Sequence, residues 1–229
     1  VAAWLRGQYE PHGELKGQVS WVQPKVDETD RLVAGEGLQR IQKTTNLCAR
    51  QPGVEGALVV FYGIDVTAQQ AAARCLAAAA QLPLLVVQLE RVIGENCPPQ
   101  QAVQMALRDA RLTGAVALLN GWDACLDEER RVAPEVLALL CEQPGPVIVA
   151  GQKAWQPGGV VRQRAVVLQE FGLPAYKQRL ALWRHYLNPS AALPRGRALI
   201  GEEGELANLA GQFALTSGQV RDAVTAAVD

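Results

Sequence analysis

The sequence predicts an α/β protein, a doubly wound five-stranded parallel sheet followed by a small all-helical lid. Two patterns carry this prediction. Between about residues 55 and 170, short apolar runs alternate with helical segments, and continuous apolar runs indicate strands buried on both faces, as in parallel sheets. After residue 170, only helical patterns remain. The chain has 229 residues, 49 % apolar and 20 % charged, which is ordinary for one globular domain with a small appendage.

The α/β part is defined by its apolar runs and by the helix signals between them. A first helix is expected over 32–50, where Leu32, Leu38 and Ile41 have loosely helical spacing. The five expected strands are 57–62, 84–87, 115–119, 146–150 and 166–168. The helices between them are the alanine-rich segment 67–80, the segment 98–112, which opens on prolines that a first turn tolerates, and 130–141.

The lid is expected to contain three helices, over 174–187, 203–213 and 216–227. The last of them begins with Thr216-Ser217-Gly218-Gln219, which can act as a capping box. Residues 1–30 are polar and rich in Gly and Pro, so we expect the tail of a preceding domain or a linker there. The predicted division is therefore 1–30, an α/β domain over 31–170, and the helical lid over 171–229.

Composition excludes several classes of protein. A net charge of −1 gives no basic stripe for nucleic acid. No apolar run reaches the roughly 18 to 20 residues of a membrane helix. The five cysteines have no Cys-x-x-Cys spacing and there are two histidines, so no metal site is expected and a reducing cytoplasm fits. The chain begins at Val1 and its one methionine is Met105, which we interpret as a piece of a longer protein.

The turn after the first predicted strand is where a doubly wound sheet usually holds phosphate. It reads GIDVTAQQ from Gly63, and a phosphate loop requires G-x-x-x-x-G-K-[ST]. Ala68 stands in place of the second glycine, Gln69 in place of the lysine, and Gln70 in place of the hydroxyl that binds Mg²⁺. Asp65 adds a negative charge that disfavours a phosphate. An alternative is that this turn is unrelated to phosphate binding.

The third predicted strand provides a second test. An active phosphate-loop ATPase that carries a helical lid has Asp-Glu directly after this apolar run. The Asp helps to hold Mg²⁺ and the Glu activates water. Asn120 and Gly121 stand there instead, and neither can do that chemistry. Asp123 comes three residues late and can simply cap the next turn. After the fourth strand, Gln152 is either a solvated loop residue or a residue that orients water.

These features resemble the AAA family of P-loop ATPases over about residues 31–229. The Gly63 turn and the strands ending at Asn120 and Gly151 correspond to its nucleotide motifs, and PAYKQRLALW from Pro174 and LTSGQVR from Leu215 are similar to the segments that open and close its helical lid. More narrowly, the chain resembles the degenerate first AAA domain of bacterial proteins with two such domains, the second of which keeps the catalytic residues.

The resemblance implies candidate nucleotide contacts at Gly63, Thr67 and Arg221, the last at the position of the family's lid arginine. Arg162 and Arg164 precede the fifth strand, where the family places an arginine finger that reaches a neighbouring subunit. For Arg221 the alternative is a solvated helix residue, and for the other two a surface charge.

Three functions remain open at this point. The first is a non-catalytic AAA-like domain, with no catalytic residue and no metal, that serves ring assembly or regulates a neighbouring active AAA domain of a larger cytoplasmic bacterial ATPase. Its partners would be other AAA domains in a homo-oligomeric ring. The second is a module that binds ATP or ADP weakly and relays occupancy through the lid. The third is an unrelated α/β module for a small ligand.

Overall fold

The computed structural model describes residues 11–23, 25–44, 57–155, 164–187 and 203–228. Its centre is one six-stranded sheet in the order β1-β3-β4-β5-β2-β6. The strands are β1 (Val19–Val22), β2 (Leu58–Tyr62), β3 (Leu84–Gln88), β4 (Val116–Asn120), β5 (Val147–Ala150) and β6 (Val166–Glu170). All neighbouring strands are parallel except β1, which is antiparallel to β3. The α/β architecture with a helical part is confirmed.

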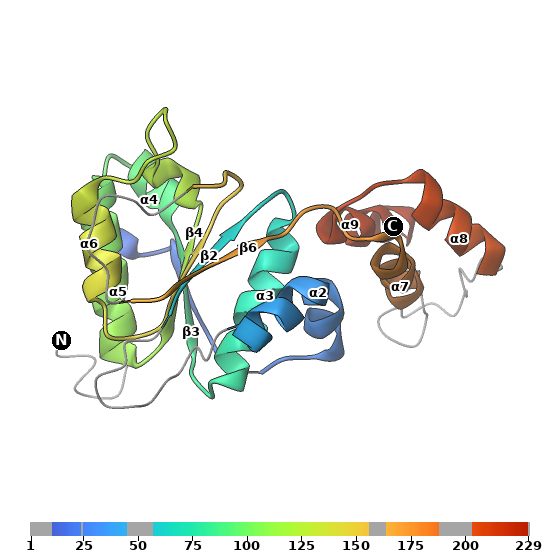
Figure 1. Ribbon diagram of the computed structural model, residues 1–229, viewed down its shortest axis with the longest axis horizontal. Coiled ribbons are helices and arrows are strands. Elements are labelled where there is room, and N and C mark those ends of the chain that lie inside the picture. The colour runs from blue at the N-terminus through green and yellow to red at the C-terminus, as the bar shows by residue number, and fades with distance from the viewer. Residues whose placement is uncertain (1–10, 24, 45–56, 156–163, 188–202, 229) are drawn as a thin grey trace.

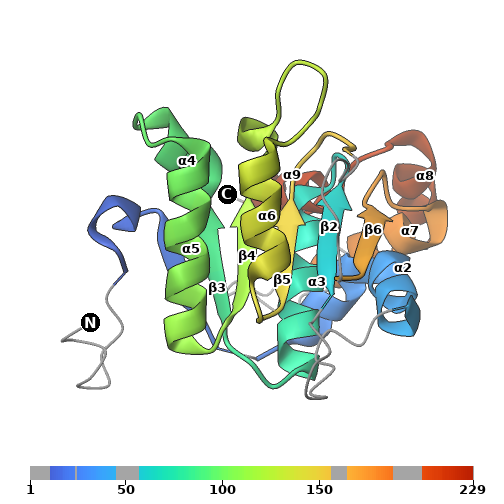
Figure 2. The ribbon, with the colours of Figure 1, turned by 60° about the vertical axis from the view of Figure 1, so that its left-hand side comes forward.

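Helices cover both faces of the sheet, as Figures 1 and 2 show. One face carries α2 (Glu28–Thr44) and α3 (Val66–Ala79), and the other carries α4 (Leu89–Gly94), α5 (Pro99–Thr113) and α6 (Pro134–Glu142). Successive residues of β2 alternate between two apolar clusters, with Val59 on the α3 side and Val60 on the α5 side. The central strands are therefore buried on both faces, which explains their continuous apolar sequences.

The helical lid consists of α7 (Tyr176–Leu187), α8 (Glu203–Gln212) and α9 (Ser217–Val228), beyond α2 and α3 in Figure 1. Leu182, Ala210 and Val220, one from each lid helix, are fully buried and share the apolar cluster of α2 and α3. The predicted capping box is confirmed, because the Thr216 N–H donates to Gln219 Oε1 (2.9 Å) and the Gln219 N–H donates to Thr216 Oγ1 (3.3 Å). No helix in the described ranges is both long and apolar enough to cross a membrane.

The sheet has one strand more than the five predicted. The additional strand β1 comes from the segment 1–30, and it pairs with β3 along all four of its residues. Its residues are half-buried or exposed, with Trp21 41 % exposed, so it leaves no apolar run in the sequence. Just before it, Leu15 is fully buried in the apolar cluster of α5. Residues 15–22 therefore pack against the α/β domain.

Two predicted helices differ from the observed ones. Helix α2 begins at Glu28 and is kinked at Gly35, whose φ of 56° is left-handed, and the part of the prediction after residue 44 lies outside the described residues. The helix expected from residue 130 begins at Pro134, because the residue before a proline is disfavoured in the helical conformation. The preceding residues form a loop closed by a bridge between Leu126 and Val132.

Candidate functional site

The Gly63 turn joins β2 to α3 at the carboxyl end of the sheet. It lies between the segment that follows β5 and the segment that follows β6. The Gly63 N–H donates to the Gln152 carbonyl (3.1 Å). Gly63 has a φ of 116°, and a Cβ there would lie 2.4 Å from the Phe171 carbonyl oxygen. Only glycine fits this conformation and this close approach. The turn is therefore held on two sides by the protein's own backbone.

Asp65, the one ionisable residue of the turn, is 1 % exposed. It caps helix α3, since its Oδ1 accepts the Ala68 N–H (3.0 Å). Its other oxygen, Oδ2, accepts the N–H of Ser217, the first residue of lid helix α9 (2.9 Å). One carboxylate therefore lies at the N-termini of two helices, where the partial positive charge of each favours an anion.

Gln69, which the sequence comparison aligns with the phosphate-loop lysine, is bound within the protein. Its side chain is 1 % exposed and turns back onto the protein, where Nε2 donates to the carbonyls of Gly63 (2.9 Å) and Gly151 (3.0 Å). Its Oε1 has no partner among the described residues. The amide thus joins the turn after β2 to the end of β5, and it supplies no charge.

The three candidate nucleotide contacts are only partly brought together. Gly63 and Thr67 belong to the same turn and the start of α3, and Thr67 Oγ1 would lie 2.5 Å from a Cβ on Gly218 of the lid. Arg221 lies one turn further along α9 with an exposed side chain, and both Nε and Nη2 donate to Asp222 Oδ1 (3.0 and 2.9 Å). A contact of Arg221 with phosphate stays a prediction.

The end of β4 contains two neutral residues, Asn120 and Gly121, at the positions where the resemblance led us to look for acids. Asn120 is 4 % exposed, and neither its amide oxygen nor its nitrogen has a partner in the described part of the chain. Gly121 is left-handed and leaves no room beside Glu90 for a Cβ. Asp123 accepts the N–H groups of Gln152 (2.8 Å) and Lys153 (2.9 Å), so it caps the segment after β5. Gln152 itself is exposed.

Arg164 is neither of the alternatives expected from the sequence. It is 3 % exposed, and its guanidinium donates to four backbone carbonyls, those of Leu140 (2.7 Å), Gln143 (2.8 Å), Ala57 (3.2 Å) and Gly145 (2.6 Å). Prediction of a surface charge or an exposed finger is therefore wrong for Arg164, which fastens the end of α6 to the start of β2. Arg162 lies outside the described residues.

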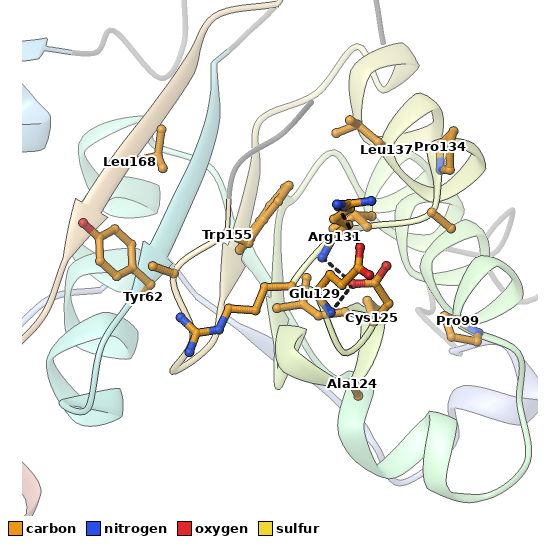
Figure 3. A pocket seen from close by; sticks show the side chains of 16 residues that line it. Tyr62, Pro99, Ala124, Cys125, Glu129, Arg131, Pro134, Leu137, Trp155 and Leu168 are labelled. Carbon is orange, nitrogen blue, oxygen red and sulfur yellow. Dashed lines mark hydrogen bonds and ion pairs between the residues drawn. The ribbon is translucent and has the colours of Figure 1, made fainter. Parts of the chain in front are cut away.

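A hollow of about 1120 Å³ lies at the same end of the sheet as the Gly63 turn. Figure 3 shows Trp155 between Tyr62 and Leu168 on one side and helix α6 on the other. Cys125 lines the hollow, and burial raises the pKa of its thiol to about 12, so it stays protonated at neutral pH. In the ranges that the structure describes, no cluster of three His, Cys, Asp or Glu side chains could hold a metal ion.

As arranged, the turn does not fit a nucleotide phosphate. A phosphate there would have to replace a buried carboxylate at the N–H groups of Ala68 and Ser217 or lie against it, and like charges repel. No lysine opposes that repulsion, because Gln69 is neutral and bound to two carbonyls. The N–H groups of Ala68 and Ser217 at the starts of α3 and α9 are therefore already bound to the protein's own carboxylate.

The mostly parallel sheet, the helices on both of its faces and the helical part after it form an α/β fold of the AAA-like kind. No known family model matches the sequence, and no curated protein matches it. Solved structures do match, among them a structure from work on the structural basis for katanin self-assembly. That likeness has a TM-score of 0.63 at 14 % identity, and covers 94 % of this chain and 76 % of the katanin chain. Katanin is an AAA ATPase, so the likeness shows an AAA-like fold.

Proposed function

We propose that this chain is a non-catalytic AAA-like domain of a larger bacterial AAA ATPase, and that it serves ring assembly or regulates a neighbouring active domain. The observation that carries the proposal is that two of the protein's own side chains, Asp65 and Gln69, fill the turn after β2. Asp65 lies where an anion would bind and Gln69 where a lysine would reach toward it, both 1 % exposed and hydrogen-bonded within the protein.

The end of β4 supports the same proposal. Phosphoryl transfer depends on a cation near the β- and γ-phosphates, a metal ion and a group that positions water. Asn120 and Gly121 offer neither a carboxylate for the metal nor a base for water, and the nearby acid Asp123 is engaged in capping the segment after β5. A domain with these residues contributes shape to an assembly instead of hydrolysis.

Exposed apolar side chains near the turn support a role in packing against other AAA domains. Ile64 and Val66 flank Asp65, and they are 54 % and 38 % exposed. Leu173 and Tyr176, between β6 and the start of α7, are 47 % and 44 % exposed. Large exposed apolar residues near one another are typical of contact surfaces. We propose other AAA domains of the same protein, in a cytoplasmic ring, as the partners.

The experiment is titration calorimetry of the purified chain with ATP and Mg²⁺, together with a phosphate-release assay. We expect no heat of binding at millimolar nucleotide and no hydrolysis above a Gln69→Ala control. Heat without hydrolysis would instead support a module that binds nucleotide weakly and relays its occupancy. Hydrolysis by the wild-type chain above the control would overturn the proposal.

A further inference from the structure

We propose that Asp65 is an internal latch whose carboxylate takes the place of a bound phosphate and holds the lid on the sheet without nucleotide. The inference rests on the proposed function in one respect, that the turn is not used by nucleotide. It concerns a contact between residues 152 positions apart in the sequence, Asp65 and Ser217. The contact joins the first turn of α3 in the α/β domain to the first residue of α9 in the lid.

The geometry of this contact is that of a shared anion site. Helices α3 and α9 have 14 and 12 residues, long enough for each N-terminus to carry its partial positive charge. Each donates one N–H to a different oxygen of the same carboxylate, at 3.0 and 2.9 Å. At 1 % exposure, little water competes for the Asp65 oxygens, which strengthens both hydrogen bonds.

The packing around the carboxylate leaves the two helix ends in direct contact. Ser217 is fully buried, and a Cβ on Gly218 would lie 2.5 Å from Thr67 Oγ1. Val220, one turn further along α9, is also fully buried in the cluster that includes α3. The first turn of α9 therefore lies against the first turn of α3.

The other end of the lid is fastened separately, at α7. Gln178 Nε2 donates to the Leu32 and Val33 carbonyls (3.3 and 3.2 Å) beside the kink of α2. Thr29 Oγ1 and His185 Nε2 are hydrogen-bonded at 2.9 Å. These contacts tie α7 to α2, whereas Asp65 ties α9 to α3. Loss of the Asp65 contact should therefore loosen α9 while α7 stays in place.

An anion that belongs to a side chain, unlike a bound ligand, is present at its site at any ligand concentration. A phosphate ligand between two helix ends is bound for most of the time only when its concentration exceeds its dissociation constant. The stabilisation of the contact between the helices then grows with the ratio of these two quantities. The Asp65 carboxylate is always present at the contact. The contact between the start of α9 and the start of α3 is thus independent of the nucleotide concentration.

Hydrogen–deuterium exchange of the 229-residue chain without nucleotide tests the latch. Asp65→Asn keeps an acceptor for the cap of α3, since Asn caps helices as well as Asp, but its amide nitrogen cannot accept the second N–H. Ser217→Pro removes the donor at a first helical position, where proline is tolerated. The matched controls are Ser217→Ala, which keeps the N–H, and Asp222→Asn, which removes an exposed carboxylate from the same helix.

We expect amides in the first turns of α9 to exchange about 10- to 100-fold faster in Asp65→Asn and Ser217→Pro, the factor that one hydrogen bond to a buried charge represents. Exchange in β4 and in both controls should match the wild type. Unchanged α9 exchange in both variants, or an equal rise throughout the chain, would overturn the latch. Calorimetry with ATP tests the proposed function independently, because the exchange experiment contains no nucleotide.

Discussion

Replacement of Arg164 by methionine should lower the free energy of unfolding of the chain. The expected effect is on stability alone, because the Arg164 side chain is bound to backbone carbonyls. The guanidinium is 3 % exposed and binds four carbonyls, three of them in deeply buried contacts. Methionine fills similar space but donates nothing, so the carbonyls of Leu140, Gln143 and Ala57 lose their charged donor.

The magnitude follows from those three groups. A buried polar group left without its partner costs about 1 to 3 kcal/mol, and removal of a buried charge returns part of that. We therefore expect the free energy of unfolding to fall by about 3 kcal/mol, a large part of the roughly 5 to 15 kcal/mol of an ordinary domain. Arg164→Lys should recover little of it, because one ammonium cannot reproduce the planar fork of donors.

Urea denaturation followed by tryptophan fluorescence measures this change as a shift of the midpoint at constant slope. The matched control is Arg40→Met, where the arginine side chain is 70 % exposed beside Glu36 on α2. That change should cost less than about 0.5 kcal/mol. If Arg164→Met were as mild as the control, Arg164 would not fasten α6 to β2 and the reasoning from its four carbonyls would be refuted.

Three further predictions concern the turn, the hollow and the lid. Gly63→Ala should destabilise the chain by at least about 2 kcal/mol in urea melts, because its φ of 116° is strained for alanine and the new Cβ would meet the Phe171 carbonyl, whereas Gly13→Ala should be neutral since nothing lies nearby. Burial raises the pKa of the Cys125 thiol from 9.0 to about 12, so the stability that the buried neutral thiol contributes is complete below pH 9 and is lost as pH rises toward 12. The fall in the free energy of unfolding over this range should be smaller in Cys125→Ala. Thr216→Ala removes the acceptor of the capping box and should cost about 1 kcal/mol, seen as faster exchange at the start of α9.

Each of the three has an outcome that contradicts it. Equal midpoints for the two glycine variants would mean that the turn can move away from Phe171. An unchanged pH decline in Cys125→Ala would mean that its thiol does not titrate in this window. Normal exchange in Thr216→Ala would mean that packing of α9 outweighs its cap.

Local patterns predicted most of the fold because the physics of those elements is local. The strands at Leu58, Val116 and Val147 are buried on both faces, so each left a continuous apolar run in the sequence. The capping box at Thr216 involves residues three positions apart, and it formed as the pattern indicated.

The candidate site depended on contacts that no local pattern contains. The sequence indicated that Asp65 would disfavour a phosphate, but its partner Ser217 is 152 residues away. The Gln69 amide reaches the Gly151 carbonyl across 82 residues. The four carbonyls around Arg164 come together only when α6 and β2 are in place. Arginine after a loop looks like a surface charge because burial of a guanidinium is rare and depends entirely on such partners.

Strand β1 has a practical consequence for anyone who prepares this protein. It covers the outer edge of β3, and Leu15 in front of it is fully buried. A fragment that starts at residue 31, the boundary suggested by composition, would leave the backbone N–H and C=O groups of β3 bare along an apolar strand. Bare edges of that kind pair with one another between molecules. Such a fragment should precipitate or form soluble aggregates during purification, whereas one that starts before His12 should remain monodisperse.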